Sequence, residues 1–190
     1  MNYKICVSGA ATGDCLNEET IEKAELVGKE IAKSGSILVS GATTGIPFYA
    51  ARGVKKLDGI SIGFSPAATH EDHVKRYQLP TRYMDLIVYT GFGYAGRNLI
   101  LTRSADAVIV ICGRIGTLNE FTVAFEDKKP LGVLINSGGI ADEIKEITEI
   151  AHKHECSVLY EEDPQKLVRG LIRDLDQMRT KENSTHHLSK

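Results

Sequence analysis

The sequence predicts an α/β protein of the Rossmann-like, doubly wound type, with a mostly parallel sheet of about seven strands in a three-layer α/β/α sandwich. Short apolar runs alternate along the chain with longer segments of helical periodicity. The apolar runs are continuous, as in strands that are buried on both faces beneath helices. Several of them end in a glycine-containing turn that leads into the next helical segment. These three observations favour parallel strands joined by crossover helices.

The expected strands are short and rich in valine, isoleucine and leucine, which suit a buried pleated surface. In chain order they span residues 3–8, 37–40, 60–64, 86–90, 107–112, 131–135 and 157–160. Glycine accounts for 18 of the 190 residues and proline for only 5. This balance favours tight strand-to-helix turns over disorder.

Six helices are expected between these strands and after the last of them. In the first, residues 18–33, apolar side chains recur at Ile21, Ala24, Val27 and Ile31, the spacing of one helix face. The last opens on an Asp-Pro pair, with proline at the first helical position. The helices after the first span residues 47–57, 94–104, 117–128, 141–154 and 164–178.

Two segments fall outside this alternation. Residues 65–85 form a long irregular stretch, which is either a lid or substrate loop or a surface excursion. Residues 179–190 are polar and show no periodicity. We therefore expect one domain over residues 1–178 and a disordered tail over residues 179–190.

The composition is that of a soluble globular protein. Hydrophobic residues make up 42% and charged residues 25%, which excludes a disordered chain, a collagen-like fibre and a coiled coil. The formal net charge is −2, so the chain has no electrostatic footprint for nucleic acid or an anionic membrane. No run approaches the roughly 20 apolar residues of a membrane span, and the first residues do not resemble a signal peptide. We expect a cytoplasmic protein with no nucleic-acid or membrane partner.

The cysteines and histidines indicate no metal site. Cys6, Cys15, Cys112 and Cys156 are far apart in the chain and form no C-x-x-C pair, so neither a zinc site nor a redox motif is predicted. Cys6 and Cys112 lie in apolar runs and are expected to be small core residues in a reducing compartment. The histidines, among them His73, lie in charged segments and are expected to be solvated.

Three of the glycine turns predict a phosphate site. Glycine lets backbone amides approach an anion closely, and the helix that follows presents its positive N-terminal end. Because the carboxyl ends of parallel strands meet at one edge of a sheet, these turns should lie together. The candidate phosphate-binding or nucleotide-binding residues in them are Ser8, Gly9, Gly41, Thr44, Gly45, Gly113, Arg114, Ile115, Gly116 and Thr117.

A fourth turn, residues 91–96, has the pattern G-x-G-x-x-G between a strand and a helix. Together with Arg114 after the next strand, this pattern is typical of a dinucleotide fold that binds NADP. An NADP-binding oxidoreductase is therefore an alternative function, although no residue stands out as a hydride-transfer partner.

Glu120 has two interpretations. It lies one helical turn beyond Thr117, so it would stand behind a phosphate held by the preceding turn. A carboxylate at that place needs a chemical task or a cationic partner, and Arg97 is a candidate for the partner. Alternatively, residues 117–120 fit the T-x-x-E capping box, in which Glu120 only caps the helix.

These segments resemble a known family. Residues 93–98 (GYAGRN), 103–107 (RSADA) and 113–120 (GRIGTLNE) resemble the signature of the LOG ("Lonely Guy") family, long mislabelled as lysine decarboxylases. The turn at residues 41–45 and the run 63–66 (GFSP) extend the resemblance over residues 3–135.

The resemblance implies an enzyme of cytokinin activation, a cytokinin riboside 5′-monophosphate phosphoribohydrolase. Such an enzyme cuts the N-glycosidic bond of a nucleoside monophosphate, which releases free base and ribose 5-phosphate. The functional arginine and glutamate of the family match Arg97 and Glu120, which would be the catalytic residues. The family also implies an AMP-like ligand, a homodimer with the site near the subunit interface, and no metal or other cofactor.

The chain departs from the family pattern at four positions. Cys112 replaces a proline, Arg114 and Ala42 replace glycines, and Asn98 stands where the enzymes usually have lysine. Arg114 is strained if its φ is positive, and it adds a phosphate contact if it points into the site. These changes shift the resemblance, with Asn98 kept as a candidate binding residue, toward a branch that includes molybdenum-cofactor carrier proteins. A non-enzymatic carrier or sensor of a phosphorylated ligand, molybdenum cofactor or nucleotide, is therefore the second hypothesis.

Overall fold

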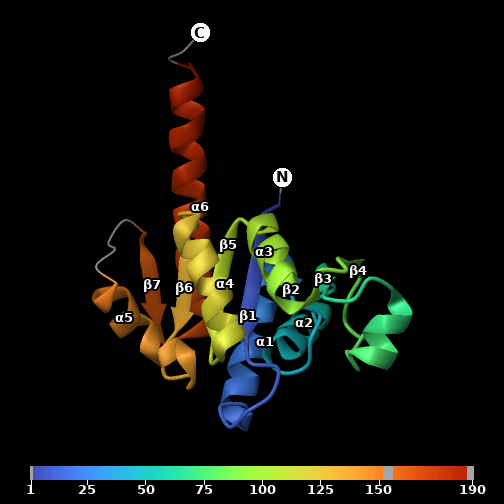
Figure 1. Ribbon diagram of the computed structural model, residues 1–190. Helices are drawn as coiled ribbons and strands as arrows, with labels where there is room; N and C mark the ends of the chain where they lie inside the picture. The colour runs from blue at the N-terminus through green and yellow to red at the C-terminus, as the bar shows by residue number, and fades with distance from the viewer. Residues whose placement is uncertain (1, 152–155, 188–190) are drawn as a thin grey trace.

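The part of the chain that the structure describes, residues 2–151 and 156–187, is built around one parallel sheet of seven strands (Figure 1). This computed structural model places the strands in the order β4-β3-β2-β1-β5-β6-β7. It confirms the expected α/β, Rossmann-like sandwich. The strands are β1 (Lys4–Gly9), β2 (Ile37–Ser40), β3 (Ser61–Ser65), β4 (Leu86–Tyr89), β5 (Ala107–Ile111), β6 (Leu131–Leu134) and β7 (Val158–Glu161).

Helices cover both faces of the sheet (Figure 1). Alternate residues of β1 point to opposite faces, so Ile5 and Val7 join one apolar core and Cys6 joins the other. Helices α1, α2 and α6 pack over the first core, and α3, α4 and α5 over the second. Their bounds are α1 (Glu18–Lys33), α2 (Ile46–Lys55), α3 (Gly93–Ser104), α4 (Ile115–Glu126), α5 (Ile140–Ile150) and α6 (Pro164–His187).

Two glycines let α1 and α2 approach each other to backbone contact. A Cβ atom at Gly28 would lie 2.0 Å from the carbonyl oxygen of Ala50, and one at Gly53 would lie 2.1 Å from that of Glu25. Neither distance leaves room for a side chain. The close contact holds α2 in place, and the N-terminal end of α2 therefore has a fixed position beside the carboxyl ends of β1 and β2.

The order of the strands reverses beside β1. From β1 the chain proceeds through β2, β3 and β4 toward one edge, and then returns to β5 on the other side of β1. In open α/β sheets, ligands bind outside the carboxyl ends of the strands at such a reversal. The topology alone therefore directs attention to the loops that follow β1 and β5.

The C-terminal helix is longer than expected. We expected it to end at Met178 and a disordered tail to follow, but α6 continues to His187 and projects from the body of the molecule (Figure 1). The hydroxyls of Thr180 and Ser184 each donate to the carbonyl four residues earlier, so these polar side chains find hydrogen-bond partners within the helix. Residues 188–190 and the end of the helix expected over 141–154 lie outside the described residues.

The irregular stretch between β3 and β4 is anchored by a buried histidine. It contains the short π-helical segment η1 (Asp72–Arg76), and His73 within it is fully buried. Its Nδ1 lies 2.8 Å from Oγ of Ser65, and its Nε2 lies 3.1 Å from the carbonyl oxygen of Pro80. The expectation that His73 is solvated was therefore wrong, because these two partners satisfy both ring nitrogens inside the fold.

None of the described helices is long and apolar enough to cross a membrane.

Candidate functional site

A cavity of about 330 Å³ opens at the carboxyl ends of the strands where the strand order reverses. Its size is within the range of small-ligand sites. Ser8, Thr44, Gly45 and Gly113 were predicted site residues, but they are not among the residues that line it. The predicted residues that line it are Gly9, Gly41, Arg97, Asn98, Arg114, Ile115, Gly116, Thr117 and Glu120.

The floor of the cavity holds a buried ion pair. Nη1 of Arg97, from α3, lies 3.3 Å from Oε1 of Glu120, from α4. The two residues are 5% and 6% exposed. The hydroxyl of Ser8, at the end of β1, donates a short hydrogen bond to the other carboxylate oxygen of Glu120. Three elements of the fold therefore fix the orientation of this carboxylate.

This arrangement decides between the two interpretations of Glu120. Helix α4 begins at Ile115 with Arg114 as its N-cap, so Glu120 lies in the second turn. A capping-box glutamate belongs to the first turn, where it reaches back to the N-cap backbone. The side chain of Glu120 instead contacts Arg97 and Ser8. Glu120 therefore does not cap α4, and its carboxyl group lies at the cavity beside Arg97 and Ser8.

Gly41 makes room for the arginine of this pair. A Cβ atom at Gly41 would lie 1.9 Å from Nη1 of Arg97. The guanidinium thus lies against the bare backbone of the turn after β2. Asn98, the next residue on α3, is also buried in the wall. In the orientation that satisfies both ends of its amide, Nδ2 donates to the carbonyl oxygen of Tyr94 and to Oε1 of Glu120, each at 2.9 Å.

The turn after β2 packs against the loop after β1. Gly45 has a φ of 68°, and a Cβ atom there would lie 2.2 Å from the carbonyl oxygen of Ala10. Thr44 donates from Oγ1 to the carbonyl oxygen of Ala11 at 3.0 Å. Both residues therefore support the loop that lines the cavity. They do not line the cavity themselves, whereas the sequence suggested that they contact the ligand directly.

The N-terminal end of α4 points its free amides at the cavity. The first amides of a helix have no partner within it, and here they belong to Ile115, Gly116 and Thr117, all of which line the cavity. Gly113, with a φ of 104°, turns the chain from β5 into this helix. Nothing lies within 4 Å of a Cβ atom placed on Gly116, so the approach to these amides is open. A phosphate fits this end of the site.

Arg114 is not strained. Its φ of −134° is that of extended backbone. The residue with a positive φ is instead Cys112, which precedes the turn and has a φ of 54°. The Arg114 guanidinium donates from Nη1 to Oγ1 of Thr12 at 3.1 Å and lies at the rim of the cavity. It therefore adds positive charge beside the amides of α4.

Burial raises the pKa of Glu120, while the Arg97 charge and the hydrogen bond from Ser8 lower it and offset part of the rise. The pKa of the carboxyl group therefore lies above its ordinary value.

Nε of Arg97 is buried without a hydrogen-bond partner in the described structure. An incompletely satisfied buried arginine is costly in a site with no function.

The G-x-G-x-x-G segment lies elsewhere. It follows β4, which is an edge strand, whereas a dinucleotide fold carries this pattern after its first, central strand. Gly91, Gly93 and Gly96 do not line the cavity. Of the residues between them, only Tyr94 reaches it.

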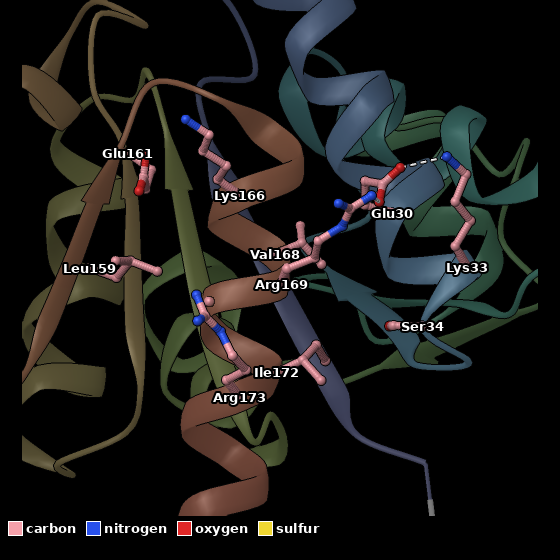
Figure 2. Close-up of a pocket in the computed structure, with 11 residues that line it drawn as sticks. Glu30, Lys33, Ser34, Leu159, Glu161, Lys166, Val168, Arg169, Ile172 and Arg173 are labelled. Atoms are coloured by element: carbon pink, nitrogen blue, oxygen red, sulfur yellow. Dashed lines mark hydrogen bonds and ion pairs between the residues drawn. The ribbon is translucent and has the colours of Figure 1, made fainter.

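A second cavity of about 650 Å³ lies against α1, α6 and β7. Figure 2 shows Glu30, which is 4% exposed, in contact with Lys33. Nζ of Lys33 lies 2.6 Å from one carboxylate oxygen of Glu30, and Nη2 of Arg169 lies 3.5 Å from the other. The buried carboxylate of this cavity is therefore already neutralised by exposed cations. The smaller cavity, with its free amides and its incompletely bonded arginine, is the better candidate.

Residues 2–168 match the family described as LDcluster4, the SLOG cluster4 family. The chain belongs to this family. A relative from Archaeoglobus fulgidus, described only as an uncharacterized protein, is 32% identical over 131 residues, which are 69% of this chain and 79% of that protein.

Solved structures resemble this SLOG protein over most of its length. The crystal structure of TM1055, a structural-genomics target, has a TM-score of 0.78 at 24% identity and covers 91% of this chain and 99% of its own. The molybdenum cofactor binding protein from Rippkaea orientalis has a TM-score of 0.73 at 26% identity, and the match covers 92% of this chain and 98% of that protein. The similarity to TM1055 shows that the two proteins have the same fold.

The structure of this SLOG protein adds a residue to the site that the sequence did not single out. The ring of Tyr94 lines the cavity, 5.9 Å from the Arg97 guanidinium carbon. Tyr94 could have been found from the sequence, because it lies three residues before Arg97 and residues at that spacing share a helix face.

A disulfide joins Cys15 and Cys112, whose Cα atoms are 6.1 Å apart. Cys112 is a buried core residue as expected, and its pairing with Cys15 is a feature that the sequence did not indicate. The two cysteines are 97 residues apart in the chain, and only the pairing of β1 with β5 brings them together. Cys6 and Cys156 are free.

Proposed function

We propose that this protein binds a nucleoside 5′-monophosphate and hydrolyses its N-glycosidic bond to free base and ribose 5-phosphate. The observation that carries the proposal is the buried Arg97–Glu120 pair, which lines the same cavity as the open N-terminal end of α4. An anion site and a carboxylate in one cavity match a substrate with a phosphate and a sugar.

The phosphate binds first in this scheme. The amides of Ile115, Gly116 and Thr117 are oriented before the ligand arrives, so they hold the phosphate without reorganisation. Arg114 at the rim adds a charge-assisted contact. The sugar then lies over the floor of the cavity, near Glu120.

The chemistry falls to Glu120. Cleavage of an N-glycosidic bond builds positive charge on the sugar, and an ionised carboxylate nearby stabilises that charge. The same carboxylate takes a proton from the water that attacks C1′ as the bond to the base breaks, and the proton then passes to the leaving base. Arg97 and Ser8 keep the carboxylate oriented and favour its ionised form.

The hydrolysis is tested by incubating the full-length protein with AMP, GMP, CMP and an N6-substituted AMP, and separating the products by chromatography. Release of free base with an equal amount of ribose 5-phosphate supports the proposal. Preference for the N6-substituted substrate would place the enzyme in cytokinin activation. Absence of free base with every substrate contradicts the proposed hydrolysis.

A carrier of a phosphorylated ligand is the second candidate. The observation that favours it is the similarity to the molybdenum cofactor binding protein from Rippkaea orientalis, at 26% identity over nearly the whole chain. Such a carrier would use the same amides and Arg114, and Glu120 would have no chemical task. A pterin absorbance that purifies with the protein supports this candidate, and binding of AMP without any cleavage does so as well.

We also propose that the protein is a homodimer that associates through α3 and β4. Leu86 and Val88 on the edge strand β4, and Phe92 and Leu99 in and before α3, are 36–69% exposed. An exposed apolar surface of this kind is typical of an interface. Sedimentation velocity should give a dimer that Leu99→Glu converts to monomers. Ile150→Glu, an equally polar change of an exposed residue on α5, should leave the dimer intact, and a monomeric wild type would contradict the proposal.

Ser8→Ala is expected to shift the pH profile of base release. The acid limb of kcat/KM reports the pKa of the carboxylate in the free enzyme. Because the hydrogen bond from Ser8 lowers the pKa of Glu120, its removal raises that pKa, and the acid limb moves to higher pH. Ser34→Ala, at the C-terminal end of α1, is the matched control and should leave the limb in place. An unchanged limb in Ser8→Ala would mean that Ser8 does not act through Glu120.

A further inference from the structure

The disulfide joins two loops beside the same cavity. Cys112 directly precedes Gly113, which turns the chain into α4, and it is fully buried. Cys15 belongs to the loop after β1, residues 10–17, and is partly accessible. Thr12 in that loop holds the Arg114 guanidinium. The bond therefore connects the two segments that surround the anion-binding end of the site.

The two loops differ in how else they are held. The backbone N–H of Cys112 donates to Oγ of Ser137 at 2.7 Å, and its carbonyl accepts from the N–H of Ala141 at 2.9 Å. The carbonyl of Gly113 accepts from the N–H of Ile140 at 3.0 Å. These bonds fix the turn whether or not the disulfide is present.

The middle of the loop after β1, residues 13–16, has much weaker anchoring than its ends. At the ends, the carbonyls of Ala10 and Ala11 accept from the N–H of Ile46 and from Oγ1 of Thr44, and Asn17 caps α1. Within the described chain, the backbone of residues 13–16 makes one such hydrogen bond, from the N–H of Leu16 to the carbonyl of Gly13, inside the same loop. Its other link to α4 is the contact between Thr12 and Arg114, and both of these residues are exposed. Opening of the disulfide therefore frees residues 13–16, beside Thr12, and leaves the turn in place.

We propose that the Cys15–Cys112 pair is a reversible redox control on the ligand site, in which the oxidised form binds the phosphorylated ligand more tightly. The proposal rests on the proposed function, because it takes this cavity as the phosphate site. In the oxidised form, the loop holds Thr12 and therefore Arg114 in position before the ligand arrives. In the reduced form, binding must order the loop, and the affinity falls by that cost.

The chemistry is thiol–disulfide exchange with a small disulfide such as oxidised glutathione. The thiolate of Cys15, the accessible partner, attacks one glutathione sulfur and releases the other glutathione as a thiol. Cys112 then attacks the mixed disulfide, forms the Cys15–Cys112 bond and releases the second glutathione. Two cysteine sulfurs are oxidised, two glutathione sulfurs are reduced, and the two protons pass from the cysteines to the glutathione thiols.

The test compares AMP binding by the full-length protein in the two redox states. The states are prepared with oxidised glutathione and with dithiothreitol, and titration of free thiols should show two more in the reduced form. Calorimetry should give an affinity at least about fivefold weaker after reduction, which is the lower range of coupling between sites. Cys15→Ser should bind like the reduced form under both conditions. Cys156→Ser, which removes a half-buried free thiol, should respond like the wild type.

Reciprocity supplies a second readout. If oxidation tightens AMP binding by a given factor, saturating AMP must raise the ratio of oxidised to reduced protein in a glutathione buffer by the same factor. Equal affinities in the two states, or a ratio that AMP does not change, would overturn the proposal and leave a purely structural crosslink. An unchanged thiol count would overturn it directly.

Hydrogen exchange separates failure of this inference from failure of the proposed function. If AMP binds in neither state, the proposed substrate is wrong. Faster exchange after reduction, confined to residues 11–17 and absent from 112–117, would then still support control of the loop by the disulfide. Exchange that is unchanged in residues 11–17 would overturn the inference whatever ligand the cavity takes.

Discussion

Glu120→Gln is expected to abolish the release of free base from nucleoside monophosphates while AMP still binds. Glutamine keeps the size of the side chain and one oxygen for Arg97, but it neither carries a negative charge nor accepts a proton. Because removal of a general base typically costs about 10²–10⁴ in rate, we expect a loss of about 10³-fold in kcat. Affinity for AMP should change little, because the phosphate contacts lie on Ile115, Gly116 and Thr117. Product chromatography and calorimetry measure the two quantities.

The matched control is Glu22→Gln, the same change at an exposed position of α1. It should release base at the wild-type rate. Wild-type release by Glu120→Gln would contradict the assigned mechanism, since another group would then have to activate the water. Loss of AMP binding in that variant would instead show that Glu120 contributes to affinity and not to the chemical step.

Gly28→Ala is expected to cause a large loss of stability. The added methyl group would lie 2.0 Å from the carbonyl oxygen of Ala50, and backbone cannot rotate away as a side chain can. Helices α1 and α2 must therefore separate, and overpacking of this kind costs about 3 kcal/mol of unfolding free energy. Urea unfolding followed by circular dichroism measures the change.

The same substitution at Gly116 should have the opposite sign. Nothing lies within 4 Å of a Cβ atom there, and the residue is in the first turn of α4. Alanine is a better helix former than glycine by about 0.5–1 kcal/mol, so Gly116→Ala should unfold at slightly higher urea. Equal stability of the Gly28 and Gly116 variants would show that the contact between α1 and α2 can relax.

The elements of this fold were predictable because their apolar patterns are strong. A continuous run such as residues 107–112 is typical of a doubly buried strand, and the periodicity of residues 18–33 gave the bounds of α1 as the structure has them. The role of Glu120 was not decided by pattern. A shift of three residues in the N-cap of α4, from Thr117 to Arg114, separates a capping box from a carboxylate at the floor of a cavity, and periodicity does not resolve helix starts so finely.

Other features depend on contacts that a local pattern does not contain. The burial of His73 follows from Ser65 and Pro80, which supply partners for both ring nitrogens. The disulfide of Cys112 depends on the pairing of β1 with β5, across a long stretch of chain. The part of α6 beyond Met178 is polar, so a rule based on apolar periodicity ends the helix too early.

The central position of β1 has a consequence for how the chain folds during synthesis. β1 is made before the other described strands, yet one of its two neighbours is β5, and the hydrogen bond from Lys4 to Asp106, the residue before β5, spans 102 residues. Until β5 has been synthesised, β1 presents an unpaired apolar edge of the kind that recruits other chains. Arg97 is made before β5, but its partner Glu120 follows it. The growing chain therefore covers this edge of β1 and acquires both residues of the Arg97–Glu120 pair within one short stretch of synthesis, residues 107–120.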